Sequence, residues 1–290
     1  MRVRKLAYGC GAEITDVDLS ADLPQSTIDD IREAWLKHVI LVFPNQDFTI
    51  DQHIRFSRRF GELESHPMKN LRSPLGPEIL EIHNRVIDGK PSETGDIGRN
   101  WHSDGAFTTQ PPTGSFLHCR AMPEAGGNTW FNNMYMAYET LSPKMKNIIA
   151  DLEVVNDINN IYIRAGGVGR RDPHKVAEDN RLNPPVIQSM VRVHSETGRK
   201  ALYLSEAVTQ RIVGLTQDEG AGILQYLFKH SVRPEFTYRH YWRINDLVLW
   251  DNRCAMHLAP RDYDPGEIRH MCRTTLTGEK LGRYLDQLPA

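Results

Sequence analysis

The sequence has few cysteines and no long apolar run. Its four cysteines are scattered among 290 residues without CxxC spacing, which excludes a disulfide-stabilised scaffold and a zinc ribbon and indicates free thiols in a reducing cytosol. The longest strongly apolar run, Val39 to Phe43, is far too short to span a bilayer. Residues 1–6 are partly basic but lack the apolar region of a signal peptide. We therefore expect a cytoplasmic protein.

An excess of charge of either sign is also absent. The chain has 35 Lys and Arg against 37 Asp and Glu, a formal net charge of -2. A balance so close to neutral gives no general attraction to nucleic acid or to an anionic membrane, and we expect neither as a partner. With 40% hydrophobic and 25% charged residues, the composition is that of a globular protein of enzyme size. The 12 histidines are the first candidates for chemistry.

The local patterns predict a few short helices among many strands. Thr49 with Gln52, and Thr216 with Glu219, form capping boxes that each begin a helix. Residues 236–244 alternate between aromatic or apolar and polar side chains, which is typical of a strand. Further expected elements are a helix capped by Ser26, a buried strand over His38–Phe43 and a strand over Arg273–Leu276. These elements favour a mainly β fold, a β-sandwich or jelly roll with flanking helices.

No repeat or domain boundary is visible, so we expect a single domain over residues 1–290. Residues 165–185 are rich in glycine and proline and form the longest expected loop. A loop of this length in a compact domain is often a lid or a binding loop, and the alternative is a surface insertion.

A candidate metal site begins at His102 and Asp104. Their i, i+2 spacing places both side chains on one face of a strand. His257, much later in the chain, is the candidate third ligand. Two histidines and one carboxylate leave three open positions on a metal, the arrangement of non-haem Fe(II) oxygenases. By itself the motif is weak, because 12 histidines produce it by chance and a lone histidine is more often structural.

Two arginines follow His257 and supply a second signal. Arg269 and Arg273 are four residues apart, so they share a face on a strand and are neighbours on a helix. A guanidinium beside a metal offers a bidentate clamp for a carboxylate, as a 2-oxo-dicarboxylate cofactor requires. Thr129 could add a hydroxyl donor. The alternative is surface ion pairing of the arginines with Asp262, Asp264 or Glu267.

Taken in order, these motifs resemble the Fe(II)/2-oxoglutarate-dependent dioxygenases of the taurine dioxygenase and 2,4-dichlorophenoxyacetate dioxygenase family. The motifs are Gly11 to Ile14, Phe56 to Gly61, Trp101 to Asp104, Gly126 to Thr129, Pro234 to Phe236, Trp250 to Arg253, and His257 with its arginines. The resemblance implies a double-stranded β-helix, or jelly-roll, core and the cofactors Fe(II), 2-oxoglutarate and O₂. It also implies a homo-oligomer, dimeric or tetrameric.

The resemblance also implies roles for individual residues. His102, Asp104 and His257 correspond to the iron ligands. Thr129 and Arg269 correspond to the partners of the far carboxylate of 2-oxoglutarate.

A further set of residues corresponds to the substrate pocket. Arg273 and His66 match residues that hold the anionic end of the substrate in the taurine enzyme, together with the backbone amide of Gly105. Lys69 replaces a substrate-binding tyrosine, and Gly98 replaces an asparagine that contacts the amine of taurine. The anion pocket is therefore retained, whereas the amine side is lost.

These departures favour an aryloxyalkanoate-like carboxylate as substrate, with an alkyl sulfonate or sulfate ester as the alternative. The expected reaction hydroxylates this small anion while 2-oxoglutarate becomes succinate and CO₂. Two alternatives of a different kind are a non-catalytic metal- or ligand-binding jelly roll, and another metal enzyme such as a zinc hydrolase or cupin-type isomerase. A different metal enzyme would have no need of the Thr129 and Arg269 pair. A non-catalytic protein would be expected to have lost an iron ligand, and none is missing here.

Overall fold

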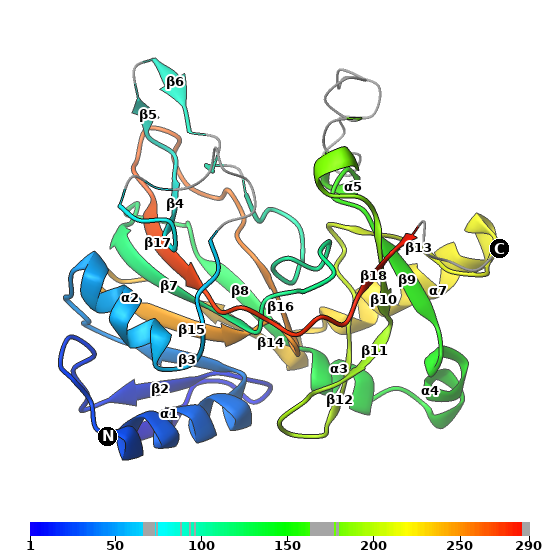
Figure 1. Cartoon of the computed structure of the whole chain (residues 1–290), viewed down its shortest axis with the longest axis horizontal. Helices are drawn as coiled ribbons and strands as arrows, with labels where there is room; N and C mark the ends of the chain where they lie inside the picture. The colour runs from blue at the N-terminus through cyan, green and yellow to red at the C-terminus, as the bar shows by residue number, and fades with distance from the viewer. Residues whose placement is uncertain are drawn as a thin grey trace.

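Two β-sheets form the core of the molecule (Figure 1). The computed structural model describes residues 1–65, 73, 75–87, 89–92, 94–95, 97–162, 177 and 180–285. The larger sheet has seven strands in the order β1-β2-β3-β15-β7-β17-β4. Their bounds are Arg2–Lys5 (β1), Ala12–Thr15 (β2), Ile40–Phe43 (β3), Leu247–Asp251 (β15), Gly114–Ala121 (β7), His270–Thr275 (β17) and Leu80–His83 (β4).

The smaller sheet has three strands in the order β14-β8-β16. Their bounds are Thr237–His240 (β14), Thr129–Asn133 (β8) and Ala255–Leu258 (β16). Phe131 and Met256 of this sheet belong to the same buried apolar cluster as Leu117 and Met271 of the larger sheet. The two sheets therefore pack face to face, and the expected jelly-roll core is confirmed.

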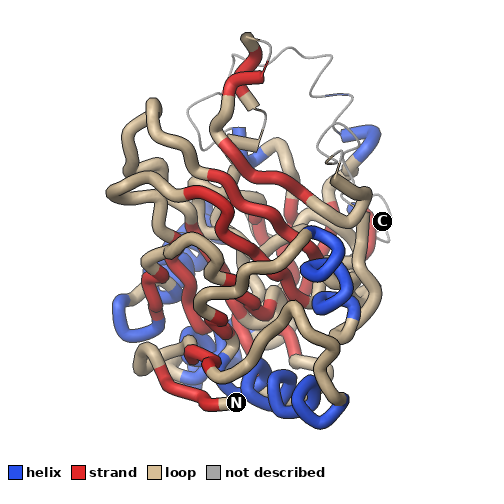
Figure 2. Tube along the Cα trace, turned by 90° about the vertical axis from the view of Figure 1, so that its left-hand side faces the viewer, coloured by secondary structure: helices blue, strands red, loops and turns tan. Residues whose placement is uncertain are grey.

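Further strands and helices surround this core. A four-stranded sheet has the order β13-β9-β10-β18, and two hairpins pair β11 with β12 and β5 with β6. Figure 2 shows most strands in the middle of the molecule and helices mainly at its edges. The strands are Val86–Ile87 (β5), Lys90–Pro91 (β6), Glu153–Asn156 (β9), Val186–Ser189 (β10), Val191–Val193 (β11), Lys200–Leu202 (β12), Thr209–Ile212 (β13) and Arg283–Tyr284 (β18). The helices are Gln25–His38 (α1), Ile50–Arg58 (α2), Met134–Glu139 (α3), Pro143–Ile149 (α4), Asn160–Tyr162 (α5), Gln217–Ser231 (α7) and Pro234–Phe236 (η3).

Two of the predicted helix starts are confirmed and one is wrong. The capping boxes at Thr49 and Thr216 are both present, at the N-termini of α2 and α7. The prediction that Ser26 caps α1 is wrong, because the N-cap is Pro24 and the helix begins at Gln25, two residues earlier than a cap at Ser26 requires. The fixed φ of proline suits this position, and the N–H groups of residues 27 and 28 bond to its carbonyl.

The predicted strand boundaries also need correction. His38 ends α1, and Val39, with φ of 69°, turns the chain before β3 begins. Of residues 236–244, only Thr237–His240 form a strand, since Asp246 accepts hydrogen bonds from the turn at Arg243 and ends the pairing. Strand β17 begins before the predicted residue 273 because its first part pairs with both β4 and β7.

Helices α1 and α2 cover the outer face of the larger sheet, where an aromatic cluster is buried. Trp35 of α1 lies directly over Gly114 of β7, and a Cβ at residue 114 would lie 2.6 Å from its ring.

We expect Gly114→Ala to lower the free energy of unfolding by about 1–3 kcal/mol through overpacking, measured by urea unfolding. Gly222 in α7 has open space around its Cα. Gly222→Ala is thus a matched control that should leave stability unchanged or increase it by about 0.5–1 kcal/mol; equal effects of the two variants would contradict the overpacking.

Some predictions fall outside the described residues. These include His66 and Lys69 and most of the expected lid, residues 165–176, 178 and 179. The single-domain organisation stays a prediction. Within the described ranges, no helix is long and apolar enough to cross a membrane.

Candidate active site

The structure brings His102, Asp104 and His257 together. His102 and His257 form an isolated antiparallel bridge, in which each backbone N–H donates to the other residue's carbonyl at 3.0 and 2.7 Å. Asp104 follows in a turn, so its position beside His102 comes from that turn and not from the predicted strand. Asp104 Oδ1 lies 4.0 Å from Nε2 of His102 and 3.9 Å from Nε2 of His257. All three donor atoms lie within 4.8 Å of one another, as ligands of one metal ion require.

The charge states of this cluster also suit a cation. Burial lowers the pKa of His102, and burial together with the nearby His102 lowers the pKa of His257 well below its usual range. Burial alone would raise the pKa of Asp104, but the positive charge of Arg273 outweighs it, helped by the neighbouring imidazoles and the hydrogen bond from Ser115, and the pKa lies below its usual value. At neutral pH the cluster therefore presents two neutral imidazoles and one carboxylate, the protonation states of metal ligands.

Hydrogen bonds orient two of these side chains. The carbonyl of Asn100 accepts a hydrogen bond from Nδ1–H of His102 at 2.8 Å. The proton is therefore on Nδ1, and the lone pair of Nε2 faces Asp104. Ser115 Oγ donates to Asp104 Oδ2 at 2.7 Å, and Asn252 Nδ2 donates to Ser115 Oγ at 3.0 Å. The network fixes one carboxylate oxygen of Asp104 and directs the other toward the histidines.

This network gives a testable role to Ser115. Ser115→Ala removes the donor to Asp104 Oδ2, and loss of such a partner of a ligand typically weakens metal binding by about 10–100-fold. We expect that decrease in Fe(II) affinity, measured by anaerobic titration. Ser57 is equally buried, on α2, and also donates to a carbonyl, so Ser57→Ala is the matched control. Equal Fe(II) affinity in the two variants would remove Ser115 from the site.

Arg273 lies against the cluster. Its Nη1 donates to Asp104 Oδ1 at 2.7 Å, the same oxygen that faces both histidines. The guanidinium is almost fully buried, and its Nε has no hydrogen-bond partner among the described residues. The positive guanidinium of Arg273 thus already binds the oxygen of Asp104 that faces the two imidazoles. This oxygen is therefore suited to a cation.

Arg269 and Thr129 are both buried, and Arg269 contacts the chain just before Thr129. Arg269 Nε donates to the carbonyl of Gly127, two residues before Thr129, at 2.9 Å. Burial lowers the pKa of this guanidinium. Thr129 Oγ1 accepts a hydrogen bond from Trp242 Nε1 at 2.9 Å, so the threonine proton can be donated elsewhere. A buried arginine beside a free hydroxyl donor is suited to a carboxylate.

The alternative partners of the two arginines are engaged elsewhere. Asp262 accepts from Gly127 N at 2.9 Å and pairs with Arg239. Asp264 and Glu267 accept from backbone N–H groups of residues 266 and 124. Among the described residues, no ion pair joins these carboxylates to Arg269 or Arg273.

Two glycines border the metal cluster. Gly105, with φ of 58°, directly follows Asp104, and a Cβ there would lie 2.4 Å from Pro112 Cδ. Gly98, with φ of 87°, approaches the ring of His102, since its Cβ would lie 3.2 Å from Cε1. Gly98 thus leaves space beside the cluster where the taurine enzyme is expected to have an asparagine.

Sequence reasoning missed Ser115, Asn252 and Glu64. The half-buried carboxyl of Glu64 follows the bridge from Leu63 to Leu276. Burial raises its pKa to about 7, with Arg273 lowering and Asp104 raising it. The only available signals were the Trp250 to Arg253 motif, which contains Asn252, and the position of Glu64 two residues before His66.

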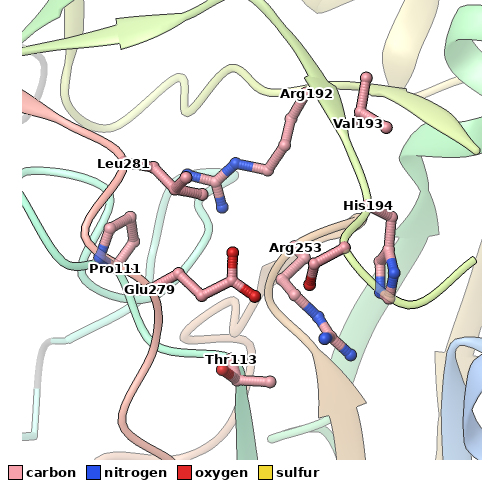
Figure 3. A pocket seen from close by; sticks show the side chains of 9 residues that line it. Pro111, Thr113, Arg192, Val193, His194, Arg253, Glu279 and Leu281 are labelled. Carbon is pink, nitrogen blue, oxygen red and sulfur yellow. The ribbon is translucent and has the colours of Figure 1, made fainter. Parts of the chain in front are cut away.

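A separate surface pocket, with a cavity volume of only about 10 Å³, is lined by none of the three clustered residues (Figure 3). Arg192, Arg253 and Glu279 line it, and no predicted site residue does. Arg253 already binds Asp251 and Glu196, and Arg192 stacks 3.6 Å over the ring of Tyr203.

Comparison with known proteins agrees with this geometry. A family model described as "Taurine catabolism dioxygenase TauD, TfdA family" matches residues 2–275. An alpha-ketoglutarate-dependent 2,4-dichlorophenoxyacetate dioxygenase from Cupriavidus pinatubonensis is 32% identical over 274 residues, or 91% of this chain and 93% of the relative. An alkylsulfatase from Acinetobacter baylyi is 32% identical over 289 residues, or 96% of this chain and 86% of the relative.

A solved structure shows the same fold. AAD-2 in complex with Mn(II) and N-oxalylglycine superposes with a TM-score of 0.87 at 31% identity, covering 96% of this chain and 98% of that one. N-oxalylglycine has the shape and charge of 2-oxoglutarate, so that structure holds a divalent metal with a 2-oxo-dicarboxylate mimic.

Proposed function

The chain belongs to the taurine catabolism dioxygenase TauD, TfdA family and is an Fe(II)- and 2-oxoglutarate-dependent dioxygenase that uses O₂, and from this premise we propose that it hydroxylates an aryloxyalkanoate-like carboxylate. The contact that carries the proposal is the one between Arg273 and Asp104. It places a buried guanidinium, suited to an organic anion, directly beside the three metal-ligand side chains.

In this proposal His102, Asp104 and His257 hold Fe(II), and Thr129 and Arg269 hold the far carboxylate of 2-oxoglutarate. When bound by these residues, the iron and 2-oxoglutarate would supply the oxidation of the substrate by O₂, with succinate and CO₂ as the other products. The protein residues contribute placement: the Asn100 and Ser115 hydrogen bonds fix the ligands. Placement decides the rate, because a misplacement of about 1 Å can cost about 100-fold.

Arg273 is the proposed clamp for the anionic end of the substrate, together with His66, Lys69 and the backbone N–H of Gly105. Arg273 Nη1 donates to Asp104 Oδ1, while its Nε has no partner among the described residues and would be available to an incoming carboxylate. If the carbon hydroxylated carries the ether oxygen, the resulting hemiacetal collapses to a phenol and a carbonyl compound.

The proposal is tested by a substrate panel scored by succinate release and by the second product. The panel contains phenoxyacetate, its 2,4-dichloro derivative, phenoxypropionate, a linear alkyl sulfate and taurine, each with an uncharged ester or amide as control. We expect an aryloxyalkanoate to stimulate succinate formation most and to yield phenol. Equal stimulation by the uncharged analogues would contradict an anion clamp.

Sulfate esters are the second candidate, because the alkylsulfatase relative is as similar as the 2,4-dichlorophenoxyacetate dioxygenase. Both substrate classes present an anion to Arg273 and differ in what leaves, sulfate or a phenol. Release of sulfate from the alkyl sulfate, without phenol from the aryloxy acids, would replace the first proposal by this one.

We also infer that the protein acts in the cytoplasm as a homo-oligomer. All four cysteines are buried and unpaired, as a reducing compartment allows. The oligomer rests on the family resemblance alone, and light scattering of the purified chain measures it directly.

A further inference from the structure

A second group of metal-ligating side chains lies on strands β4 and β17. The antiparallel register sets Cys272 opposite Glu81 and His270 opposite His83. Because side chains two residues apart on a strand share a face, all four project from the same side of the sheet. The patch therefore has a potential ligand at each of its four corners.

Three of the four donor atoms are already close. His270 Nε2 lies 3.0 Å from Glu81 Oε1, and Cys272 Sγ lies 4.0 Å from His270 Nε2. The donors of Glu81, His270 and Cys272 all lie within 4.8 Å of one another. Bonds of about 2.0–2.3 Å to tetrahedral zinc place its donors about 3.3–3.8 Å apart, so small side-chain shifts would complete the geometry. The ring of His83 packs edge-on against that of His270, with centroids 5.6 Å apart.

This patch is separate from the catalytic cluster. Met271 and Arg273 alternate with His270 and Cys272 along β17 and project to the opposite side, into the space between the two sheets. The iron-site candidates contain no sulfur. The side chain of Glu81 is 19% exposed and that of His270 10% exposed, so an ion can reach the patch from solvent on the side of Glu81.

The charges in the patch balance those of a divalent cation. Burial lowers the pKa of His270, so its imidazole is neutral at pH 7 as a ligand must be. Burial and the carboxylate of Glu81 raise the pKa of Cys272 above its usual value, and the guanidinium of Arg120 offsets this only in part, so the thiol would lose its proton when a cation binds. Arg85, also nearby, acts in the same direction as Arg120. A thiolate and one carboxylate together neutralise a divalent ion, which offsets repulsion from these two arginines.

We propose that Glu81, His270 and Cys272, with His83 as the fourth ligand, form a second metal site that binds Zn²⁺. The mixed sulfur, nitrogen and oxygen donor set is one that zinc accepts, whereas Mg²⁺ and Ca²⁺ prefer oxygen alone. The site would join the edge strand β4 to β17, the strand that also carries Arg273.

Cobalt provides the test, because Co²⁺ replaces Zn²⁺ and a cobalt–thiolate bond has a near-ultraviolet charge-transfer absorption. Metal-free full-length protein is titrated with Co²⁺ without oxygen. We expect a second equivalent of Co²⁺ per chain, accompanied by the sulfur band. Asp104→Ala should lose the other equivalent and keep the band, which separates this site from the iron site.

Variants of the patch decide the assignment. Cys272→Ser should abolish the sulfur band, and Glu81→Gln, which retains the shape of the side chain, should weaken the titration at least about tenfold. Cys119→Ser is the matched control, since Cys119 is buried on the neighbouring strand β7 and belongs to no group of metal-ligating side chains among the described residues. A wild-type titration without a sulfur band, or a band that survives in Cys272→Ser, would overturn the proposal.

Discussion

Replacing His102 with alanine should reduce substrate-dependent succinate release by more than about 100-fold. Loss of a residue that merely hydrogen-bonds to a ligand costs about 10–100-fold, and removal of the ligand itself should cost more. The fold should survive, because the bridge from residue 102 to His257 uses backbone atoms that alanine retains. The measurements are succinate formation and the visible absorption that appears when Fe(II) and 2-oxoglutarate are added without oxygen.

A buried histidine outside the cluster provides the control. His230 on α7 is buried and lies near the carbonyl of Ala137 at 2.9 Å. His230→Ala should lose stability by an amount similar to His102→Ala while keeping both the absorption band and turnover. If His102→Ala also kept both, His102 would not be an iron ligand and the cluster would need another function.

The three proposed ligands were predictable from the sequence because their chemistry resides in their own side chains. His102 and Asp104 are two residues apart, and His257 belongs to a recognisable set of motifs with the arginines that follow it. The residues that orient them were not predictable in the same way. Ser115 and Asn252 are 137 residues apart and meet only because β7 pairs with β15. Nothing about a serine or an asparagine in a sequence indicates that its side chain will orient a metal ligand.

The element boundaries failed for a related reason. A capping box is a local interaction, and both predicted boxes are present. The extent of β17 instead depends on β4 and β7, its partners on either side, which extend it to His270. The same pairing sets Glu81 opposite Cys272, so a group of ligands on two distant strands could not be found before the register was known.

Replacing Arg269 with alanine should raise the 2-oxoglutarate concentration needed for half-maximal turnover by about 30-fold or more. Truncating one partner of a buried, hydrogen-bonded charge pair costs about 2–5 kcal/mol, and each 1.4 kcal/mol is about tenfold in affinity. The proposed pair is the guanidinium of Arg269 with the far carboxylate of 2-oxoglutarate. Turnover at saturating 2-oxoglutarate should fall much less, because this carboxylate does not change during the reaction.

Two further variants sharpen this prediction. Arg269→Lys keeps the charge but loses the planar pair of donors, so its 2-oxoglutarate requirement should lie between wild type and alanine. Arg239 pairs with Asp262 at the rim of the same region and stacks near Trp130, so Arg239→Ala is the control and should leave the requirement unchanged. An unchanged requirement in Arg269→Ala would transfer the 2-oxoglutarate role to Arg273, the other arginine of the candidate site, and the substrate anion would then need a different partner.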